Sequence, residues 1–320
     1  MERQLLELRF AYQAGLTDRR NLWQAVSNEG QKLRQFQSLI NGSTVAAIEI
    51  EPDRLIVRFR SGLRMIWFPE DIRAATSIAV MEGTYEPAEY RFFTDLARDK
   101  KIVMDVGANI GWYSLNLAKM TAIPNVQIHA FEPVPSSYKQ LLQNIALNRA
   151  QNQIVPHNIG LGSSSGEMVF YVPDFSGSTA ASGRNLHPEE TNERVKCQIR
   201  TADSFLMQEN VPQVGLVKCD VEGAELLVLK GAKRLLEEDR PVFILELLRK
   251  WSRAFDYHPN DVLMLLRGYG YGCWAIGNER LRFLNEVTDE TPEKNYIFLH
   301  EGHQVERNLI DPWLSSKPST

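Results

Sequence analysis

The stretch Ile102–Met120, IVMDVGANIGWYSLNLAKM, decides the fold. An apolar run ends in Asp105, passes through a loop that contains Gly107 and Gly111, and continues with the apolar spacing of a helix. Glycine lets the backbone turn tightly and approach a ligand closely. A helix that starts directly after such a loop presents free N–H groups to that ligand. The stretch therefore predicts a strand, a ligand-binding loop and a helix, in that order.

The same alternation of strand and helix continues on the C-terminal side of this stretch, as far as residue 300. The predicted strands are KIVMDV, QIHAFE, QIVPHNIGL, VGLVKCDV, PVFILEL, YGCWAIG and NYIFLH. Such alternation is typical of an α/β protein with a doubly wound, mostly parallel sheet and right-handed crossovers. We therefore expect a seven-stranded Rossmann-like sheet. Between the third and fourth strands, GEMVFYVP and VKCQIR predict an inserted β-hairpin.

Three units are expected along the chain. Residues 1–75 combine helical spacing over residues 2–40, interrupted at Gly15 and Gly30, with three short alternating runs that predict an antiparallel β-meander. The helices either pack on the main domain or pair with another copy in a homo-oligomer. Residues 76–300 form the main domain. Residues 301–320 are polar with two prolines, and we expect a loose tail there.

Composition excludes several classes of function. The 36 Lys and Arg residues are scattered against 40 Asp and Glu residues, so the net charge is -4 and no basic stripe favours nucleic-acid binding. The three cysteines lie far apart and show no zinc spacing or disulfide framework. No apolar run approaches the ~20 residues of a membrane span, and no signal-like core begins the chain. We expect a cytoplasmic enzyme or binding protein.

The glycine loop departs from the pattern of a dinucleotide site. It is G-x-x-x-G, and Asp105 stands where its charge would oppose a pyrophosphate. A cationic ligand resolves the conflict, and S-adenosylmethionine carries a sulfonium and an ammonium. Asp105 is expected to hold its amino-acid end, with backbone N–H groups around Asn109 and Gly111 on its carboxylate. Glu132 ends the second strand, where an acid accepts hydrogen bonds from ribose hydroxyls. An NAD-dependent oxidoreductase is the less favoured alternative.

Carboxylates gather at the ends of two later strands. VGLVKCDVEGAE delivers Lys218, Asp220 and Glu222, and the next strand ends in Glu246. Charged groups at a strand exit are costly to bury, which favours a functional role. Methyl transfer needs aligned reactants and removal of the acceptor proton. Asp220 is the first candidate for that base and Glu222 the second. No metal is predicted, although the paired oxygens of Asp220 and Glu246 would also suit Mg²⁺ or Ca²⁺.

These motifs resemble the FkbM-family S-adenosylmethionine-dependent methyltransferases. The matching pieces span roughly residues 80 to 300 and are GTYEP, MDVGANIGWYS, FEP, NIGLG, TADSF and VKCDVEGAELLVLKG. The resemblance implies that the predicted seven-stranded, mostly parallel sheet is the Rossmann-like sheet of methyltransferases. It also implies O-methylation of a hydroxyl on a sugar, a glycolipid or a secondary metabolite. A non-catalytic protein that retains the cofactor pocket is the alternative.

The resemblance also implies roles for individual residues. Its cofactor-site positions correspond here to Asp105, Gly107, Asn109, Gly111, Ser114, Glu132 and Asn158. Tyr85 and Glu86 match a Tyr-Glu pair expected to flank the cofactor or the acceptor. The family's usual Leu-Asp-Asp is Ala202, Asp203 and Ser204 here, so only Asp203 carries over, as an expected contact on the adenine side.

Overall fold

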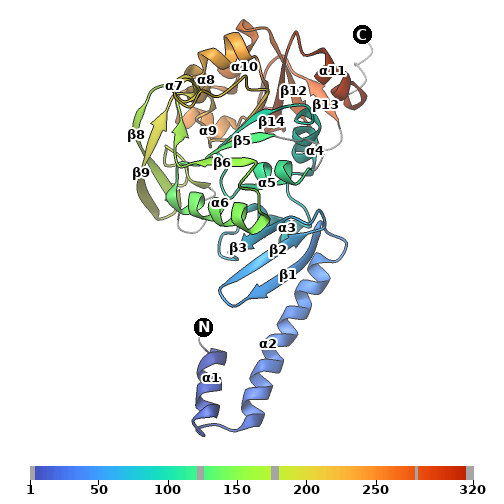
Figure 1. Cartoon of the computed structure of the whole chain (residues 1–320), viewed down its shortest axis with the longest axis vertical. Coiled ribbons are helices and arrows are strands. Elements are labelled where there is room, and N and C mark those ends of the chain that lie inside the picture. Colours follow the sequence, from blue (N-terminus) through green and yellow to red (C-terminus); the bar gives the residue numbers. More distant parts are fainter. Residues whose placement is uncertain (1–3, 121–125, 174–179, 278–279, 315–320) are drawn as a thin grey trace.

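A computed structural model describes residues 4–120, 126–173, 180–277 and 280–314. Its main body is an α/β unit, from which a small sheet and a helical hairpin project (Figure 1). The N-terminal elements are α1 (Gln4–Gln13), α2 (Arg19–Ile40), β1 (Val45–Glu51), β2 (Arg54–Phe59) and β3 (Arg64–Trp67). The next are α3 (Ala75–Glu82), α4 (Pro87–Leu96), β4 (Ile102–Val106), α5 (Trp112–Lys119), β5 (Gln127–Phe131), α6 (Pro135–Asn148) and β6 (Ile154–His157).

The second half of the chain completes the central sheet. Its elements are β7 (Gly160–Leu161), β8 (Gly166–Pro173), β9 (Asn192–Arg200), α7 (Ala202–Gln208), β10 (Leu216–Cys219), α8 (Glu225–Lys230), the π-helical turn Leu235–Asp239, β11 (Val242–Glu246), α9 (Arg249–Ala254), α10 (Pro259–Gly268), β12 (Tyr271–Ile276), β13 (Leu281–Phe283), β14 (Asn295–His300), α11 (Gln304–Ile310) and the 3₁₀ turn Asp311–Trp313. The central sheet has the order β13-β12-β14-β11-β10-β4-β5-β6. Strands β6, β5, β4, β10 and β11 run parallel, whereas β14 is antiparallel to both its neighbours.

This sheet confirms the predicted doubly wound, mostly parallel architecture. It has eight strands in the described part of the chain rather than the predicted seven, because β13 adds a short antiparallel edge to β12. Only three residues form β13, too few to show an alternating pattern in the sequence. The inserted hairpin is also confirmed, since β8 and β9 pair antiparallel in a separate sheet with the order β7-β9-β8.

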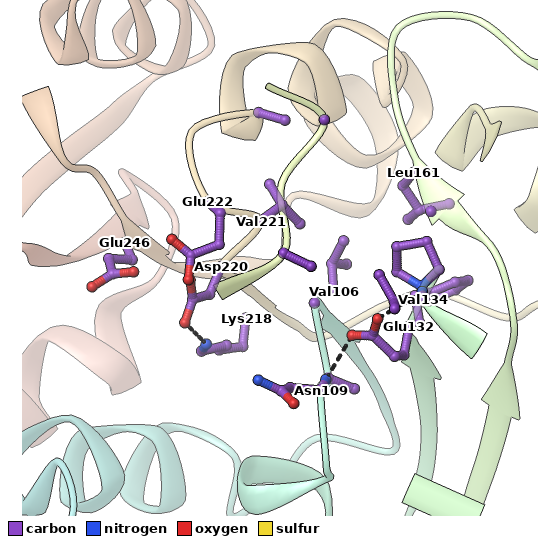
Figure 2. Close-up of a pocket in the computed structure, with 18 of the residues that line it drawn as sticks. Val106, Asn109, Glu132, Val134, Leu161, Lys218, Asp220, Val221, Glu222 and Glu246 are labelled. Carbon is purple, nitrogen blue, oxygen red and sulfur yellow. Dashed lines mark hydrogen bonds and ion pairs between the residues drawn. The ribbon is translucent and has the colours of Figure 1, made fainter. Parts of the chain in front are cut away.

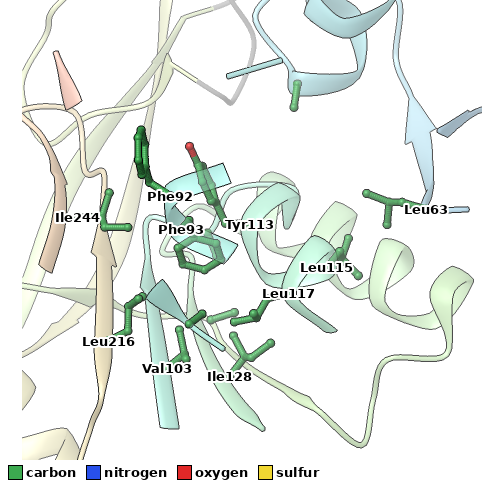
Figure 3. Close-up of a cluster of buried hydrophobic side chains, with 14 of the residues drawn as sticks. Leu63, Phe92, Phe93, Val103, Tyr113, Leu115, Leu117, Ile128, Leu216 and Ile244 are labelled. Carbon is green, nitrogen blue, oxygen red and sulfur yellow. The ribbon is translucent and has the colours of Figure 1, made fainter. Parts of the chain in front are cut away.

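Both faces of the central sheet are buried, so its strands are almost wholly apolar. Successive side chains alternate between two cores. Val103 and Leu216 point into the core under α4, α5 and α6, whereas Met104 and Val217 point into the core under α7, α8 and α10. Figure 3 shows the first core, where Phe93 of α4 and Leu117 of α5 pack over the strands. This two-sided burial holds the carboxyl ends of the strands in fixed positions.

The strand order reverses between β4 and β10. The chain moves outward from β4 to β6 and then returns to β10 on the other side of β4. In open parallel sheets, ligands bind in the crevice outside the carboxyl ends at such a switch point. The Gly107 loop follows β4, and the Asp220 loop follows β10, so both predicted motifs lie at this crevice.

The N-terminal meander is joined to the main body by specific contacts. Its strands pair antiparallel in the order β1-β2-β3, as predicted. The backbone N–H groups of Arg64 and Ile66 donate to the side-chain oxygens of Asn148 and Asn144 on α6, at 3.0 and 2.8 Å. Helix α2 runs through Gly30 without a break, so the predicted interruption there is wrong, whereas Gly15 does lie in the turn between α1 and α2.

The C-terminal segment is more ordered than the predicted loose tail. Helix α11 pairs Glu306 with Lys100, and Ile310 is buried. The guanidinium of Arg91 lies 3.7 Å from the centre of the Trp313 ring, which explains how a polar segment attaches to the domain. Residues 315–320 of the predicted tail lie outside the described residues. No described helix has the length and apolar character that crossing a bilayer requires.

Candidate functional site

A cavity of about 390 Å³ opens at the switch point. Its walls include the loops that follow β4, β5, β10 and β11, together with residues from α3, the α3–α4 connection, the β8–β9 hairpin and α9. Figure 2 shows Asn109 and Glu132 on one side of the cavity and Lys218, Asp220, Glu222 and Glu246 on the other. The cavity therefore has a glycine-loop end and an acidic end.

Gly107 allows the β4 and β10 loops to meet. Its φ is 81°, and a Cβ on this residue would lie 1.8 Å from the carbonyl oxygen of Asp220. No other residue can be accommodated without moving the backbone. Gly111, with φ 96°, begins α5 but does not line the cavity. The glycine loop thus fixes how closely the two predicted motifs approach each other.

Asp105 is buried behind this loop and does not line the cavity. Its Oδ2 accepts hydrogen bonds from Oγ and N–H of Ser114, at 2.6 and 3.1 Å. Burial raises the pKa of Asp105, with Lys218 and Ser114 opposing the shift. Its Oδ1 has no hydrogen-bond partner among the described residues. In this structure Asp105 and Ser114 secure the start of α5, rather than forming the cavity wall that the sequence predicted.

Glu132 does line the cavity, at its glycine-loop end. The backbone N–H groups of Asn109 and Val134 donate to its two carboxylate oxygens, at 3.0 and 2.8 Å. Burial raises the pKa of Glu132 to about 7, although these hydrogen bonds oppose the shift. Asn158 donates to the carbonyls of Glu132 and Pro133, so it supports this turn from outside the cavity.

Lys218 organises the acidic end. Its buried Nζ lies 2.7 Å from Asp220 Oδ2 and 4.4 Å from the centre of the Tyr113 ring. Tyr113 in turn donates its hydroxyl hydrogen to Glu86 Oε2 at 2.5 Å. Tyr85 and Glu86 both line the cavity, so the structure brings this predicted pair to the acidic end. The neighbouring carboxylates raise the pKa of Lys218 despite its burial.

The carboxyl groups at this end differ in proton affinity. Burial opposes ionisation of Asp220, but Lys218 and a hydrogen bond with Glu246 outweigh it, so the pKa of Asp220 lies below its usual value. Burial and the charge of Asp220 raise the pKa values of Glu222 and Glu246 well above normal. Burial also raises the pKa of Glu86. Asp220 is therefore the ionised partner of Lys218, and its neighbours are the stronger bases.

Glu222 is held in an unusual backbone conformation. Its φ is 54°, and Gly223 follows with φ 100°. Glu225, at the start of α8, accepts from the N–H groups of Val221 and Gly223, which keeps this tight loop in place. A non-glycine residue at positive φ is uncommon and is often found at functional sites. Glu222 Oε2 is buried without a partner in the described part of the chain.

Asp203 is not at the cavity. Its two carboxylate oxygens accept from the N–H groups of Lys233 and Arg234, at 3.0 and 2.9 Å. Helix α8 ends at Lys230, and the N–H groups of Lys233 and Arg234 begin the next helical turn without partners inside a helix, so Asp203 supplies them. Asp203 therefore caps this turn and lies away from the cavity at which an adenine-side contact was predicted.

Several cavity residues were not predicted. Arg73 and Lys294 line it, as do Met168 and Phe170 of the hairpin. Arg73 lies outside the segment that resembles a known family, and Lys294 matches none of its motifs, so no motif pointed to either residue. Within the described ranges, the group of three possible metal ligands close enough for one ion is His187, Glu189 and Glu190. It does not include the cavity acids.

The fold and its site define a Rossmann-like α/β protein with a ligand cavity at the switch point of its sheet. Residues 105–273 match the methyltransferase FkbM domain, and the chain belongs to this methyltransferase family. The resemblance found in the sequence is therefore confirmed.

Two named methyltransferases and one solved structure are similar to this chain. The hexuronic acid methyltransferase AglP of Haloferax volcanii is 28% identical over 207 residues, which is 64% of this chain and 77% of AglP. The methyltransferase sdnD of Sordaria araneosa is 34% identical over 160 residues, or 40% of this chain and 59% of sdnD. A crystal structure of methyltransferase FkbM from Methylobacillus flagellatus is 18% identical, with a TM-score of 0.40, covering 85% of this chain and 60% of that one.

Proposed function

We propose that the protein transfers a methyl group from S-adenosylmethionine to a hydroxyl oxygen of a sugar or a related small molecule. The observation that carries this proposal is one cavity with two chemically different ends. Glu132 and the glycine loop form an end suited to a nucleoside, and Asp220, Glu222 and Glu246 form an end suited to a cation and a proton transfer.

Unpaired polar atoms support a cofactor of this kind. Asn109 Oδ1 and Trp112 Nε1 belong to cavity-lining residues, are buried, and have no hydrogen-bond partner among the described residues. Buried polar groups are usually paired, so such atoms indicate a missing ligand. Each oxygen of Glu132 accepts one backbone hydrogen bond and retains lone pairs for ribose hydroxyls.

The acidic end suits the reactive group of the cofactor. S-adenosylmethionine supplies a methyl group on a positively charged sulfonium. The ionised Asp220 and the nearby Glu86 favour a positive charge in this part of the cavity, and the burial of both groups limits screening by water. Lys218 opposes this attraction, but its ion pair with Asp220 offsets its charge.

Glu222 is the proposed proton acceptor. Sequence reasoning favoured Asp220, but Asp220 is bound to Lys218 and its pKa is lowered. Glu222 lines the cavity, its Oε2 is unpartnered in the described chain, and its pKa is raised. A base with a higher pKa removes an acceptor proton more readily. Asp220 and Glu246 are proposed to position Lys218 and the reactants.

The acceptor class is suggested by a relative. AglP is named for a hexuronic acid, so a uronic acid sugar is one proposed acceptor for this chain. Aromatic side chains at the cavity, including Trp112 and Trp251, provide surfaces on which a sugar ring can pack. A non-catalytic role is less well supported. Asp220, Glu222 and Glu246 lie together in the cavity, and burying several carboxyl groups is costly in a protein that does not use them.

Calorimetry tests the cofactor. The protein is titrated with S-adenosylmethionine, with S-adenosylhomocysteine and with NAD. Both sulfur compounds should bind, and NAD should not, because the loop lacks the dinucleotide glycine pattern. Binding of NAD without a response to either sulfur compound would reject the proposal.

A second copy of the chain is the proposed partner of the N-terminal hairpin. Helix α2 has no buried residue, and Trp23, Val26 and Leu33 expose 59%, 51% and 51% of their surface. Helix α1 adds exposed Leu6 and Phe10. Pairing of two such hairpins would bury these apolar side chains.

A further inference from the structure

An arginine and a histidine from segments outside the proposed chemistry meet at the cavity wall. Arg73 lies between β3 and α3 and lines the cavity, before the segment that matches the family. His187 lies between β8 and β9 and is only 6% exposed. Arg73 Nη1 is 2.9 Å from His187 Nε2. The N-terminal region and the hairpin insertion are thus joined beside the cavity.

The chemistry of this contact fixes the protonation of the histidine. A guanidinium only donates hydrogen bonds, so Nε2 of His187 must be the acceptor. The ring proton is then on Nδ1, which lies 3.4 Å from Glu189 Oε1. His187 therefore anchors Arg73 through Nε2, and Glu189 and Glu190 lie 3.4 and 3.8 Å from its Nδ1. A carboxylate in place of the ring would have neutralised the arginine.

Arg73 consequently keeps its charge available to a ligand. Among the residues that the structure describes, it makes no ion pair within 4.0 Å. It is close enough to Glu222 to favour ionisation of that residue, which places it near the acidic end. The side chain has further N–H donors beyond the one used by His187, arranged in a fork that matches a carboxylate. Lys294 adds a second cation to the wall.

We propose that Arg73, positioned by His187, binds a carboxylate of the methyl acceptor, so that the acceptor is an acidic sugar rather than a neutral one. This inference rests on the proposed methyltransferase function and adds the residue that selects the substrate. The carboxylate binds at Arg73, and the hydroxyl to be methylated then lies toward Glu222. Arg73 is a specificity-determining residue, and His187 is a positioning residue.

The test uses the full chain saturated with S-adenosylhomocysteine. Binding of methyl β-glucuronide and methyl β-glucoside, which differ in a carboxylate, is compared by ligand-observed NMR titration. Wild type should prefer the glucuronide by roughly tenfold, the effect of one charge-assisted hydrogen-bonded contact. Arg73→Gln should remove the preference while glucoside binding stays the same. His187→Ala should reduce the preference, and Arg73→Lys should restore only part of it, because lysine lacks the fork.

Arg98→Gln is the matched control, because Arg98 is an exposed arginine paired with Asp95 on α4 and is not part of the cavity. It should leave the preference unchanged. Equal binding of the two sugars by wild type, no binding of the glucuronide, or a preference that survives in Arg73→Gln would each overturn the inference. A protein that fails to bind S-adenosylhomocysteine at all would instead overturn the proposed function, so the two failures are distinguishable.

Discussion

Lys218 Nζ lies 2.7 Å from Asp220 Oδ2, and this ion pair gives Asp220 a different character from the other acids of the cavity. Lys218 is buried beneath Tyr113 and depends on Asp220 for a direct charge partner. Glu222 and Glu246 form no ion pair within 4.0 Å in the described part of the chain, and they hold their protons more tightly. Asp220 is thus expected to stabilise the buried Lys218, whereas a different carboxylate is expected to take part in catalysis.

The first prediction concerns Glu222. Glu222→Gln keeps the size and polarity of the side chain but removes the proton acceptor. It should lower kcat by ~10²–10⁴, as for a lost general base, with little change in cofactor affinity. Transfer of a labelled methyl group to an acidic sugar measures kcat, and calorimetry measures the affinity. Full activity in this variant would remove Glu222 from the mechanism.

The second prediction is that Asp220 stabilises the fold through Lys218 and is not the proton acceptor. Asp220→Asn leaves Lys218 buried without its direct ionic partner, and breaking a buried pair costs about 3 kcal/mol of unfolding free energy. Urea unfolding should show this loss. Lys218→Met combined with Asp220→Asn should recover part of it, because the unpaired charge is removed. If Asp220→Asn alone is as stable as wild type, the ion pair contributes little.

The third prediction is a pH dependence of cofactor binding. Burial raises the pKa values of Glu86, Glu222 and Glu246, so these carboxyl groups hold protons more tightly than exposed ones do. A positive sulfonium favours their ionised forms. Affinity for S-adenosylmethionine should therefore rise with pH, with protons released on binding, whereas S-adenosylhomocysteine lacks the sulfonium charge and should respond less. Calorimetry in buffers of different ionisation enthalpy measures this, and a flat response to S-adenosylmethionine would contradict it.

The fourth prediction concerns acid stability. His129 Nδ1 and His157 Nε2 lie 3.0 Å apart, and the two rings stack, with Glu209 and Arg200 as the nearest charged influences. Burial and the neighbouring histidine lower the pKa of His157 from 6.5 to about 4. Because the folded state disfavours the protonated ring, this stabilisation is complete above about pH 6.5 and is lost as the pH falls toward 4, at a cost of roughly 2 kcal/mol.

His157→Phe isolates this effect, because phenylalanine can stack on Phe131 and Phe205 but cannot be protonated. Glu132, with a pKa raised to about 7, contributes a pH dependence of the opposite sign in both proteins. The difference in unfolding free energy between wild type and variant, measured from pH 7 to pH 4.5, should therefore shrink or reverse as the pH falls. A constant difference would show that the histidine pair does not titrate on unfolding.

The fifth prediction tests the N-terminal hairpin. Trp23→Gln with Val26→Gln removes two exposed apolar side chains from α2 and should convert a dimer to a monomer, as measured by light scattering. Phe283→Gln is the control, because Phe283 exposes 53% of its surface on β13, far along the chain from the hairpin. A wild-type monomer at high micromolar concentration would contradict the proposal.

The sequence predicted those parts of the fold that depend on local pattern. The strand ending at Asp105 and the strand ending at Lys218, Asp220 and Glu222 were both identified, because apolar runs bounded by polar residues mark buried parallel strands. Their adjacency followed from the general topology of such sheets. The acids at the cavity were therefore found without a structure.

Side-chain direction and distant partners could not be predicted in the same way. Asp105 turns toward Ser114 instead of the cavity, and Asp203 caps the helical turn that begins at Lys233 and Arg234. Arg73 and His187 are brought together only by packing of the hairpin on the N-terminal region. No spacing rule relates residues so far apart in the chain.

The cavity wall is assembled from the segment that matches the family and from the parts of the chain that flank this segment. The segment matching the family supplies the glycine loop, Glu132 and Glu222, whereas Arg73 and Lys294 lie outside residues 105–273. Mutations in the flanking segments can therefore retune which molecule is accepted without disturbing the machinery that acts on it. For protein engineering, the two flanks form a compact library target, in which variants can be screened for new acceptors while the central segment is left untouched.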